Sequence, residues 1–149
     1  MRVMHAETVV AALRDGSDPP EVAVEAAAGA HLLVLPESIG GVPVDGATNP
    51  EQLFGSAYAG CMLFAIEHAA RRRRLDRAVL RGLRSEAAVR IGRAKDGTNR
   101  LEVDLTITVP GLAQADAEAL CAFATRFCPF HQAIDGNVEG SFRVVGSPD

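Results

Sequence analysis

The chain has 149 residues, a length that suits one domain with a hydrophobic core of its own. Apolar residues make up 48% of it and charged residues 23%, which is the mixture of an ordinary globular protein. The formal net charge of -4 argues against a nucleic-acid-binding protein. We interpret the one basic run, Arg71 to Arg74, as a solvated helix end, where cations oppose the negative pole of the helix dipole.

The absence of targeting signals and the cysteine content predict a cytoplasmic protein without a membrane partner. The first apolar stretch is too short for a secretory signal, and residues 53–66 fall below the roughly twenty residues of a membrane span. An odd number of cysteines, three, argues against a secreted disulfide framework. Because the cysteines and the four histidines lack the spacing of metal ligands, we expect no metal and no cofactor.

The first third of the chain predicts three strands and a long loop. Residues 6–13 form a candidate strand that ends at the turn Arg14-Asp15-Gly16. Residues 21–26 alternate with a period of two, and residues 31–35 resemble a short buried strand. Residues 36–47 are too rich in glycine and proline for regular structure, so they form a loop long enough to be functional.

A helix is predicted to begin at Asn49-Pro50 and to run to the arginine run. Asn49 serves as the cap, Pro50 takes the first helical position, and Gln52 stands where a capping-box partner belongs. Apolar residues surround most of its circumference, which is typical of a buried helix. The chain offers only one other long helix to cover it, so we expect a homodimer with a large apolar interface.

The second half predicts a hairpin of two strands. Residues 87–91 resemble a strand, and residues 95–99 (KDGTN) form a hairpin turn. Residues 101–109 alternate strictly between apolar and polar side chains, which is the strongest strand pattern in the chain. Pro110-Gly111 is expected to end that strand.

The last segment predicts one helix and one strand. Residues 112–127 are helical with apolar side chains on one face, and Pro129 ends the helix. Residues 138–144 alternate as a final strand. The predicted order is β-β-β-α-β-β-α-β, an α+β fold with an antiparallel sheet and a buried central helix, in one domain over residues 1–149.

The three cysteines lie on the two predicted helices. Cys121 and Cys128 are seven positions apart on one helix, roughly 10 Å along its axis, so they cannot form a disulfide while that helix is continuous. Cys61 lies on the other helix and could meet either of them. Cys121, on the apolar face, is interpreted as an inert core residue.

Cys61 needs help from other residues if it is to act as a nucleophile. It lies mid-helix among apolar residues, which raises a thiol pKa, so a cation must come from elsewhere. Arg14 is one candidate, and Glu51 is the carboxylate that could hold it. Glu51 precedes Cys61 by ten residues, about 15 Å along a straight helix, so it can act only through Arg14, a helix break near Gly55 or a partner chain. Cys128, at a helix end that can move, suits a resolving role.

Three motifs in the chain resemble the Ohr branch of the OsmC/Ohr family, the organic hydroperoxide resistance proteins. The first is residues 47–54 (ATNPEQLF) with residues 57–61 (AYAGC). The second is residues 128–130 (CPF) with Ala133 and residues 136–137 (GN), and the third is residues 14–16 (RDG). They occur in the family's order at compatible spacing, and the predicted element order agrees along nearly the whole chain.

The resemblance implies an OsmC-like fold, an intertwined homodimer and a metal-free thiol peroxidase. By matching positions, Cys61 is the peroxidatic cysteine and Cys128 the resolving cysteine, while Arg14 and Glu51 activate the thiolate. A Cys61 sulfenic acid would condense with Cys128 to a disulfide, which a dithiol reductant of the lipoyl type would reduce. The apolar lining suits fatty-acid or other bulky organic hydroperoxides.

The chain differs from the family pattern near the second motif. Phe130-His131-Gln132 replaces the usual Tyr-Ser-Asn, and Asp135 replaces an arginine. These differences concern the reductant and the substrate range more than the two-cysteine chemistry. His131 is either a polar loop residue or a group that tunes Cys128.

Two other functions fit parts of the same pattern. One is acyl transfer with Cys61 as nucleophile and a histidine as base, although His68, seven residues from Cys61, is too far along the helix for that role. The other is a dimeric carrier of apolar ligands that uses the interface pocket without redox chemistry. A burst with a nitrophenyl ester would support acyl transfer. The carrier predicts ligand binding that Cys61→Ser does not affect and no disulfide after peroxide treatment.

Overall fold

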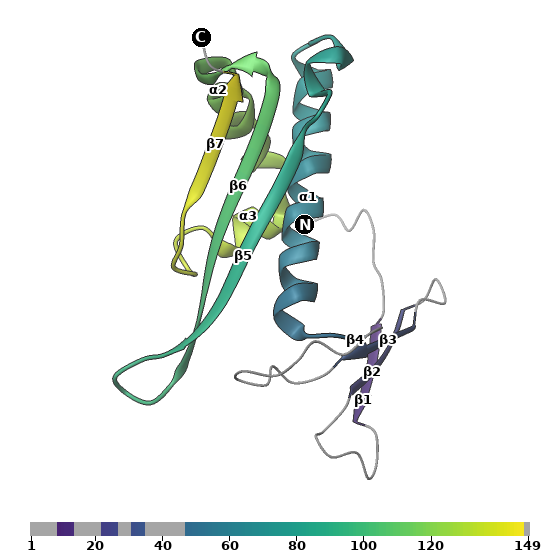
Figure 1. The fold of residues 1–149 in the computed structure, drawn as a ribbon, viewed down its shortest axis with the longest axis vertical. Coiled ribbons are helices and arrows are strands. Elements are labelled where there is room, and N and C mark those ends of the chain that lie inside the picture. The colour runs from purple at the N-terminus through teal and green to yellow at the C-terminus, as the bar shows by residue number, and fades with distance from the viewer. Residues whose placement is uncertain (1–8, 14–21, 27–30, 35–46, 148–149) are drawn as a thin grey trace. The chain divides into compact units, whose positions relative to one another are not determined.

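The computed structural model divides the chain into two units, each with a sheet of its own (Figure 1). The first unit is residues 1–53 and the second is residues 54–149, with helix α1 (Pro50–Arg72) beginning in the first and continuing in the second. The residues that the structure describes are 9–13, 22–26, 31–34 and 47–147.

The first unit contains a sheet of four strands in the order β1-β2-β3-β4. Strands β1 (Val9–Leu13), β2 (Val22–Ala26) and β3 (His31–Val34) pair antiparallel and confirm the three predicted strands. The two-residue strand β4 (Ala47–Thr48) pairs parallel with β3, so the predicted loop over 36–47 was wrong at its last residue. The turn at residues 14–16 lies outside the described residues.

Helix α1 confirms the helix predicted from its start signal. The backbone N–H of Gln52 donates to the Asn49 side chain at 2.7 Å, so Asn49 is the cap. The predicted capping box is only half formed, because the Gln52 side chain accepts from the Thr48 hydroxyl at 2.9 Å instead of returning to Asn49. At Gly55 an added Cβ would lie 3.1 Å from Val89, so the glycine allows α1 to pack closely against the sheet of the second unit.

The second unit is built on the predicted hairpin. Strand β5 (Arg84–Arg93) pairs antiparallel with β6 (Asn99–Ala113), and Gly97 takes a positive φ of 85° in the turn. The apolar residues of β6 turn inward, as their alternation predicts: Val103, Leu105, Ile107 and Val109 are buried.

The final strand differs from its prediction in direction. Strand β7 (Phe142–Ser147) pairs parallel with β6, so the sheet is mixed and the prediction of an antiparallel sheet was wrong. A period-two pattern fits either direction, and the helical connection after β6 carries the chain back to begin a parallel strand. Gly140 fits this return, because an added Cβ there would collide with the Val103 backbone carbonyl.

Strand β6 is also longer than predicted, since it passes through Pro110-Gly111 to Ala113. The pairing with β5 stops at Thr108, so Pro110 removes no hydrogen bond from that ladder. The pairing with β7 is irregular between Thr108 and Ala113, as a proline in a strand requires.

The predicted helix over 112–127 is shorter, and a further helix follows it. Helix α2 (Gln114–Ala124) passes into a 3-10 turn, η2 (Thr125–Phe127), and Cys128 takes an extended conformation. Pro129 then begins helix α3 (Pro129–Ile134), so the prediction that this proline only ends a helix was wrong. Proline suits both positions, because it cannot continue a helix but its fixed φ suits a first helical residue.

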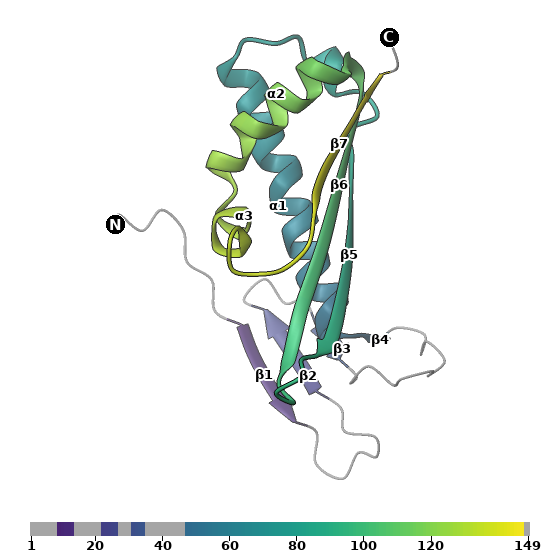
Figure 2. The same ribbon diagram turned by 90° about the vertical axis from the view of Figure 1, so that its left-hand side faces the viewer.

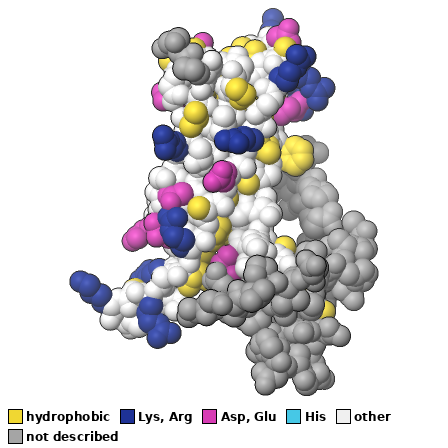
Figure 3. All heavy atoms as spheres, viewed as in Figure 1, with side chains coloured by type: hydrophobic (Ala, Val, Ile, Leu, Met, Phe, Trp, Pro, Cys, Tyr) yellow, Lys and Arg dark blue, Asp and Glu magenta, His cyan; other side chains and the backbone are white. Residues whose placement is uncertain are grey.

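The helices of the second unit lie on one face of its three-stranded sheet (Figure 2). The hydrophobic core of this unit includes Met62, Ile66, Leu120 and Cys121, which are all fully buried. The opposite face carries charged side chains (Figure 3). Arg90 of β5 pairs with Glu102 of β6 at 2.8 Å and with Asp104. Within the described residues, no helix has the length and apolar character to cross a membrane.

Candidate active site

The sulfur atoms of Cys61 and Cys128 lie 3.0 Å apart, although the residues are far apart in sequence. Cys61 is half-buried on α1, and Cys128 is fully buried where η2 meets α3. Both are free thiols, and the Cys128 thiol donates a hydrogen bond to the Cys61 sulfur. Of the two partners that the sequence left open for Cys61, the structure brings Cys128 to it.

The local sequence explains how Cys128 reaches this position. Its backbone lies at φ -94° and ψ 105°, which breaks the run of helical residues before Pro129. Cys128 therefore caps α3, and its sulfur accepts a hydrogen bond from the His131 backbone N–H at 3.4 Å. The prediction that this cysteine ends a helix was incomplete, because Cys128 lies between the end of η2 and the start of α3.

Burial is the main influence on the Cys128 thiol and raises its pKa to about 12. The hydrogen bond to Cys61 raises the pKa further, because it uses the thiol proton, whereas the backbone N–H groups of His131 and Phe130 lower it. Cys128 is therefore a protonated donor at neutral pH. This arrangement suits a thiol that stabilises a neighbouring thiolate before it attacks.

Tyr58 and His131 form a second contact between α1 and α3. The Tyr58 hydroxyl lies 2.8 Å from His131 Nδ1, and the Tyr58 side chain is 3% exposed. Burial raises the Tyr58 pKa to about 12, and negative charge on Cys128, Asp135 or Cys61 would raise it further. Tyr58 was not predicted as a site residue, although its position three residues before Cys61 places both on one side of the helix.

Cys121 is fully buried within α2, as predicted for an inert core residue. Burial alone raises its pKa to about 12, so the reactive thiolate form is strongly disfavoured. Cys121 is thus an internal reference cysteine for tests of the other two.

We expect the folded chain to lose stability above about pH 9, because Tyr58, Cys121 and Cys128 have pKa values of about 12. The unfolded chain releases these protons near pH 8.5 to 10. Their stabilisation is complete below the unfolded pKa and is lost as the pH rises toward about 12.

A Cys121→Ala variant should flatten this decline by up to about 1.4 kcal/mol per pH unit, the effect of one proton. The measurement is urea unfolding under reducing conditions between about pH 8 and about pH 11. An equal dependence on pH in the variant and the parent chain would contradict the assignment.

The two remaining predicted site residues are Arg14 and Glu51. Arg14 lies outside the described residues. Glu51 lies in the first turn of α1, and its Oε2 is buried without a hydrogen-bond partner among the described residues. Since α1 runs unbroken through Gly55, the alternative of a helix break that brings Glu51 to Cys61 was wrong.

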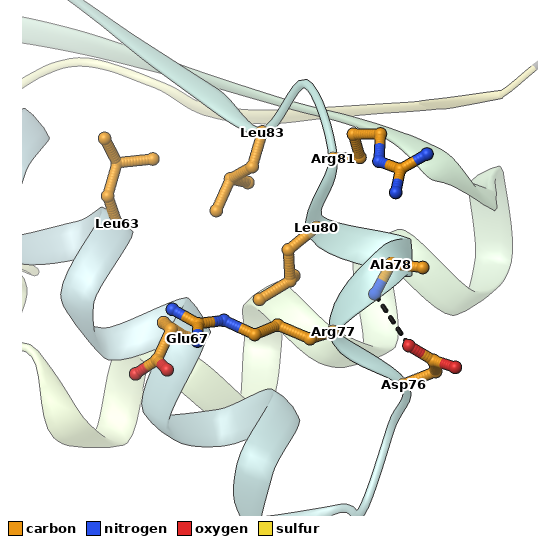
Figure 4. Close-up of a pocket in the computed structure, with 8 residues that line it drawn as sticks. All are labelled: Leu63, Glu67, Asp76, Arg77, Ala78, Leu80, Arg81 and Leu83. Carbon is orange, nitrogen blue, oxygen red and sulfur yellow. Dashed lines mark hydrogen bonds between the residues drawn. The ribbon is translucent and has the colours of Figure 1, made fainter.

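A surface hollow of about 600 Å³ lies beside the C-terminal half of α1 (Figure 4). Its lining combines apolar and charged side chains and includes neither Cys61 nor Cys128: Leu63, Glu67, Asp76, Arg77, Ala78, Leu80, Arg81 and Leu83. Within the part of the chain that the structure describes, no cluster of three or more His, Cys, Asp or Glu residues could hold a metal ion.

Comparison with known proteins identifies relatives of this chain. The family of OsmC-like proteins matches residues 43–142. The organic hydroperoxide resistance protein of Xanthomonas axonopodis pv. citri is 37% identical over 108 residues, which are 72% of each chain.

Solved structures extend the similarity to nearly the whole chain. An organic hydroperoxide resistance protein from Elizabethkingia anophelis, with thiocyanate bound, is 26% identical with a TM-score of 0.83, over 98% of this chain and 99% of that one. A putative organic hydroperoxide resistance protein from Vibrio cholerae, with captopril bound in one of its active sites, is 31% identical with a TM-score of 0.78, over 97% and 94%. The chain belongs to the OsmC/Ohr family, and its relatives support a function in organic hydroperoxide resistance.

Proposed function

We propose that this protein is a thiol peroxidase that reduces organic hydroperoxides through Cys61 and Cys128. The observation that carries the proposal is the 3.0 Å contact between their sulfur atoms. A disulfide needs a sulfur–sulfur distance of about 2.05 Å, so a shift of about 1 Å would join them. The proposal is supported further by relatives named as organic hydroperoxide resistance proteins.

The proposed reduction of an organic hydroperoxide has three steps. The Cys61 thiolate attacks the outer peroxide oxygen, the O–O bond breaks, and a proton completes the alcohol while Cys61 becomes a sulfenic acid. The Cys128 sulfur then attacks the Cys61 sulfur, the S–O bond breaks, and water leaves with the thiol proton. A dithiol, for which we propose a lipoyl group in the cytoplasm, reduces the disulfide by exchange and becomes a disulfide itself.

Arg14 and Glu51 complete the proposed site. A guanidinium near Cys61 would favour its thiolate, and a carboxylate would orient that guanidinium. The Oε2 atom of Glu51 supports this role, since it is buried without a hydrogen-bond partner among the described residues and a buried carboxylate oxygen requires a donor. An Arg14→Lys variant keeps the charge without the planar fork and should therefore be slower in the peroxide step.

We propose that the active unit is a homodimer that covers one face of α1. Phe64 is 79% exposed, and Ala57 and His68 are exposed at helical spacing from it. Cys61 lies at the border between this face and the buried face of Tyr58 and Met62, so a partner subunit would close the apolar surroundings of the thiol.

A Phe64→Glu variant should shift the protein from dimer to monomer, because a carboxylate is costly to bury in an apolar interface. Light scattering coupled to size-exclusion chromatography gives the mass directly. Ile91→Glu, at a half-exposed apolar residue of β5, is the matched control and should stay dimeric. A monomeric parent chain at all concentrations would contradict the dimer.

The central test is the mass of the reduced protein after one equivalent of cumene hydroperoxide. We expect a loss of two hydrogens that peptide mapping assigns to Cys61 and Cys128. Unchanged mass would favour a carrier of apolar ligands, and stable sulfinic acid on Cys61 would show that Cys128 does not resolve.

A further inference from the structure

We propose that Tyr58 and His131 form a hydrogen-bonded latch that holds Cys128 against Cys61 during the step that closes the disulfide. The latch is defined as the contact between the Tyr58 hydroxyl and His131 Nδ1, at 2.8 Å. The inference rests on the proposed two-cysteine function and concerns its second step.

The latch and the reacting sulfurs bridge the same two helices. Tyr58 precedes Cys61 by three residues on α1, and His131 follows Cys128 by three residues at the start of α3. Residues three apart on a helix lie on one side of it. The Tyr58–His131 contact therefore runs beside the Cys61–Cys128 contact and restrains the separation of the two helices at that point.

His131 is also hydrogen-bonded, through its backbone, to the Cys128 sulfur that closes the disulfide. Its backbone N–H donates to the Cys128 sulfur at 3.4 Å, so the residue whose side chain is held by α1 orients the resolving sulfur. The imidazole packs edge-on against Phe142 of β7, with ring centroids 5.2 Å apart, which gives the ring a second contact. Movement of His131 away from Tyr58 would carry the Cys128 sulfur with it.

The Tyr58 hydroxyl carries a proton at neutral pH and can serve as the donor of the latch. With its pKa raised to about 12, the phenol stays protonated and can donate to Nδ1 in the tautomer that leaves this nitrogen without a proton. A buried tyrosine hydroxyl that loses its partner is costly, so separation of the pair is disfavoured. Tyr58 and His131 are thus positioning residues, since neither side chain needs to exchange a proton with substrate.

Positioning matters here because the Cys61 sulfenic acid has two fates. Attack by Cys128 forms the disulfide and releases water. Attack of the sulfenic acid on a second hydroperoxide molecule breaks its O–O bond, releases a second alcohol and leaves sulfinic acid, which a dithiol does not reduce. A Cys128 sulfur held near 3 Å favours the first fate by proximity.

The test separates the two steps in the reduced full-length chain with cumene hydroperoxide. Consumption of the first equivalent reports sulfenic acid formation, and mass analysis after rapid quenching reports the disulfide. In Tyr58→Phe and His131→Leu we expect disulfide formation to be about five- to tenfold slower than in the parent, with more sulfinic acid at excess peroxide. The first step should slow by less than disulfide formation, because only part of the Cys128–Cys61 hydrogen bond is lost.

Two matched variants distinguish the hydrogen bond from the bulk of the ring. In His131→Asn the amide occupies the place of Nδ1, so it should restore most of the rate, whereas His131→Gln should not. Parent rates of disulfide formation in both Tyr58→Phe and His131→Leu would overturn the latch, as would a His131→Asn variant as slow as His131→Leu. Failure of the parent chain itself to form a disulfide would overturn the proposed function, which is a different result.

Discussion

A Cys61→Ser variant should lose all reduction of organic hydroperoxides, with a rate at least about a thousandfold below the parent. The attacking group must be a polarisable thiolate, which a cysteine thiol can form near neutral pH. A serine hydroxyl does not ionise at neutral pH, and its oxygen is less polarisable than sulfur. The substitution removes the sulfur that accepts the hydrogen bond from Cys128 and leaves the fold intact, because Cys61 is only half-buried. The measurement is consumption of cumene hydroperoxide with dihydrolipoamide as reductant.

Cys121→Ser is the matched control for this experiment. It makes the same chemical change at a cysteine that is fully buried on α2 and takes no part in the Cys61–Cys128 contact, so turnover per folded molecule should persist. Near-parent activity in Cys61→Ser would refute the peroxidase mechanism. Loss of activity in both variants, with both folded, would instead implicate Cys121 as a participant.

The sequence predicted α1 and the β5–β6 hairpin well because their signals are local. Asn49 and Pro50 satisfy the first turn of α1 whatever the rest of the chain does. The alternation from Leu101 to Val109 is likewise intrinsic to a strand with one buried face. The direction of β7 was not predictable in this way, because it depends on the end of β6 at which the returning chain begins the new strand.

The candidate site was predictable in its chemistry and less so in its geometry. The resemblance to known family motifs indicated Cys61 and Cys128, but the spacing along the chain said nothing about their 3.0 Å contact. The error at Pro129 had a consequence for the site, because a helix start at that residue supplies backbone N–H groups to the Cys128 sulfur. Tyr58 was not predicted as a site residue, because an aromatic residue on an apolar helix is usually a residue of the hydrophobic core.

A Cys128→Ser variant should abolish disulfide formation while leaving the first peroxide step nearly intact. The serine hydroxyl keeps a hydrogen-bond donor toward Cys61 but cannot attack its sulfenic acid. We expect one equivalent of peroxide to be consumed at close to the parent rate, and a few equivalents to convert Cys61 to sulfinic acid. Trapping of the sulfenic acid with a cyclic dione, followed by mass analysis, measures both products.

Comparison with Cys128→Ala then tests the hydrogen bond between the two sulfurs. Alanine removes both the donor and the resolving sulfur, so its first step should be slower than that of Cys128→Ser by about three- to tenfold, the effect of one hydrogen bond to a charged sulfur. Equal first steps in the two variants would mean that Cys128 resolves the sulfenic acid without activating Cys61. Full steady-state turnover in either variant would mean that another thiol resolves it, and peptide mapping of the new disulfide would identify that thiol.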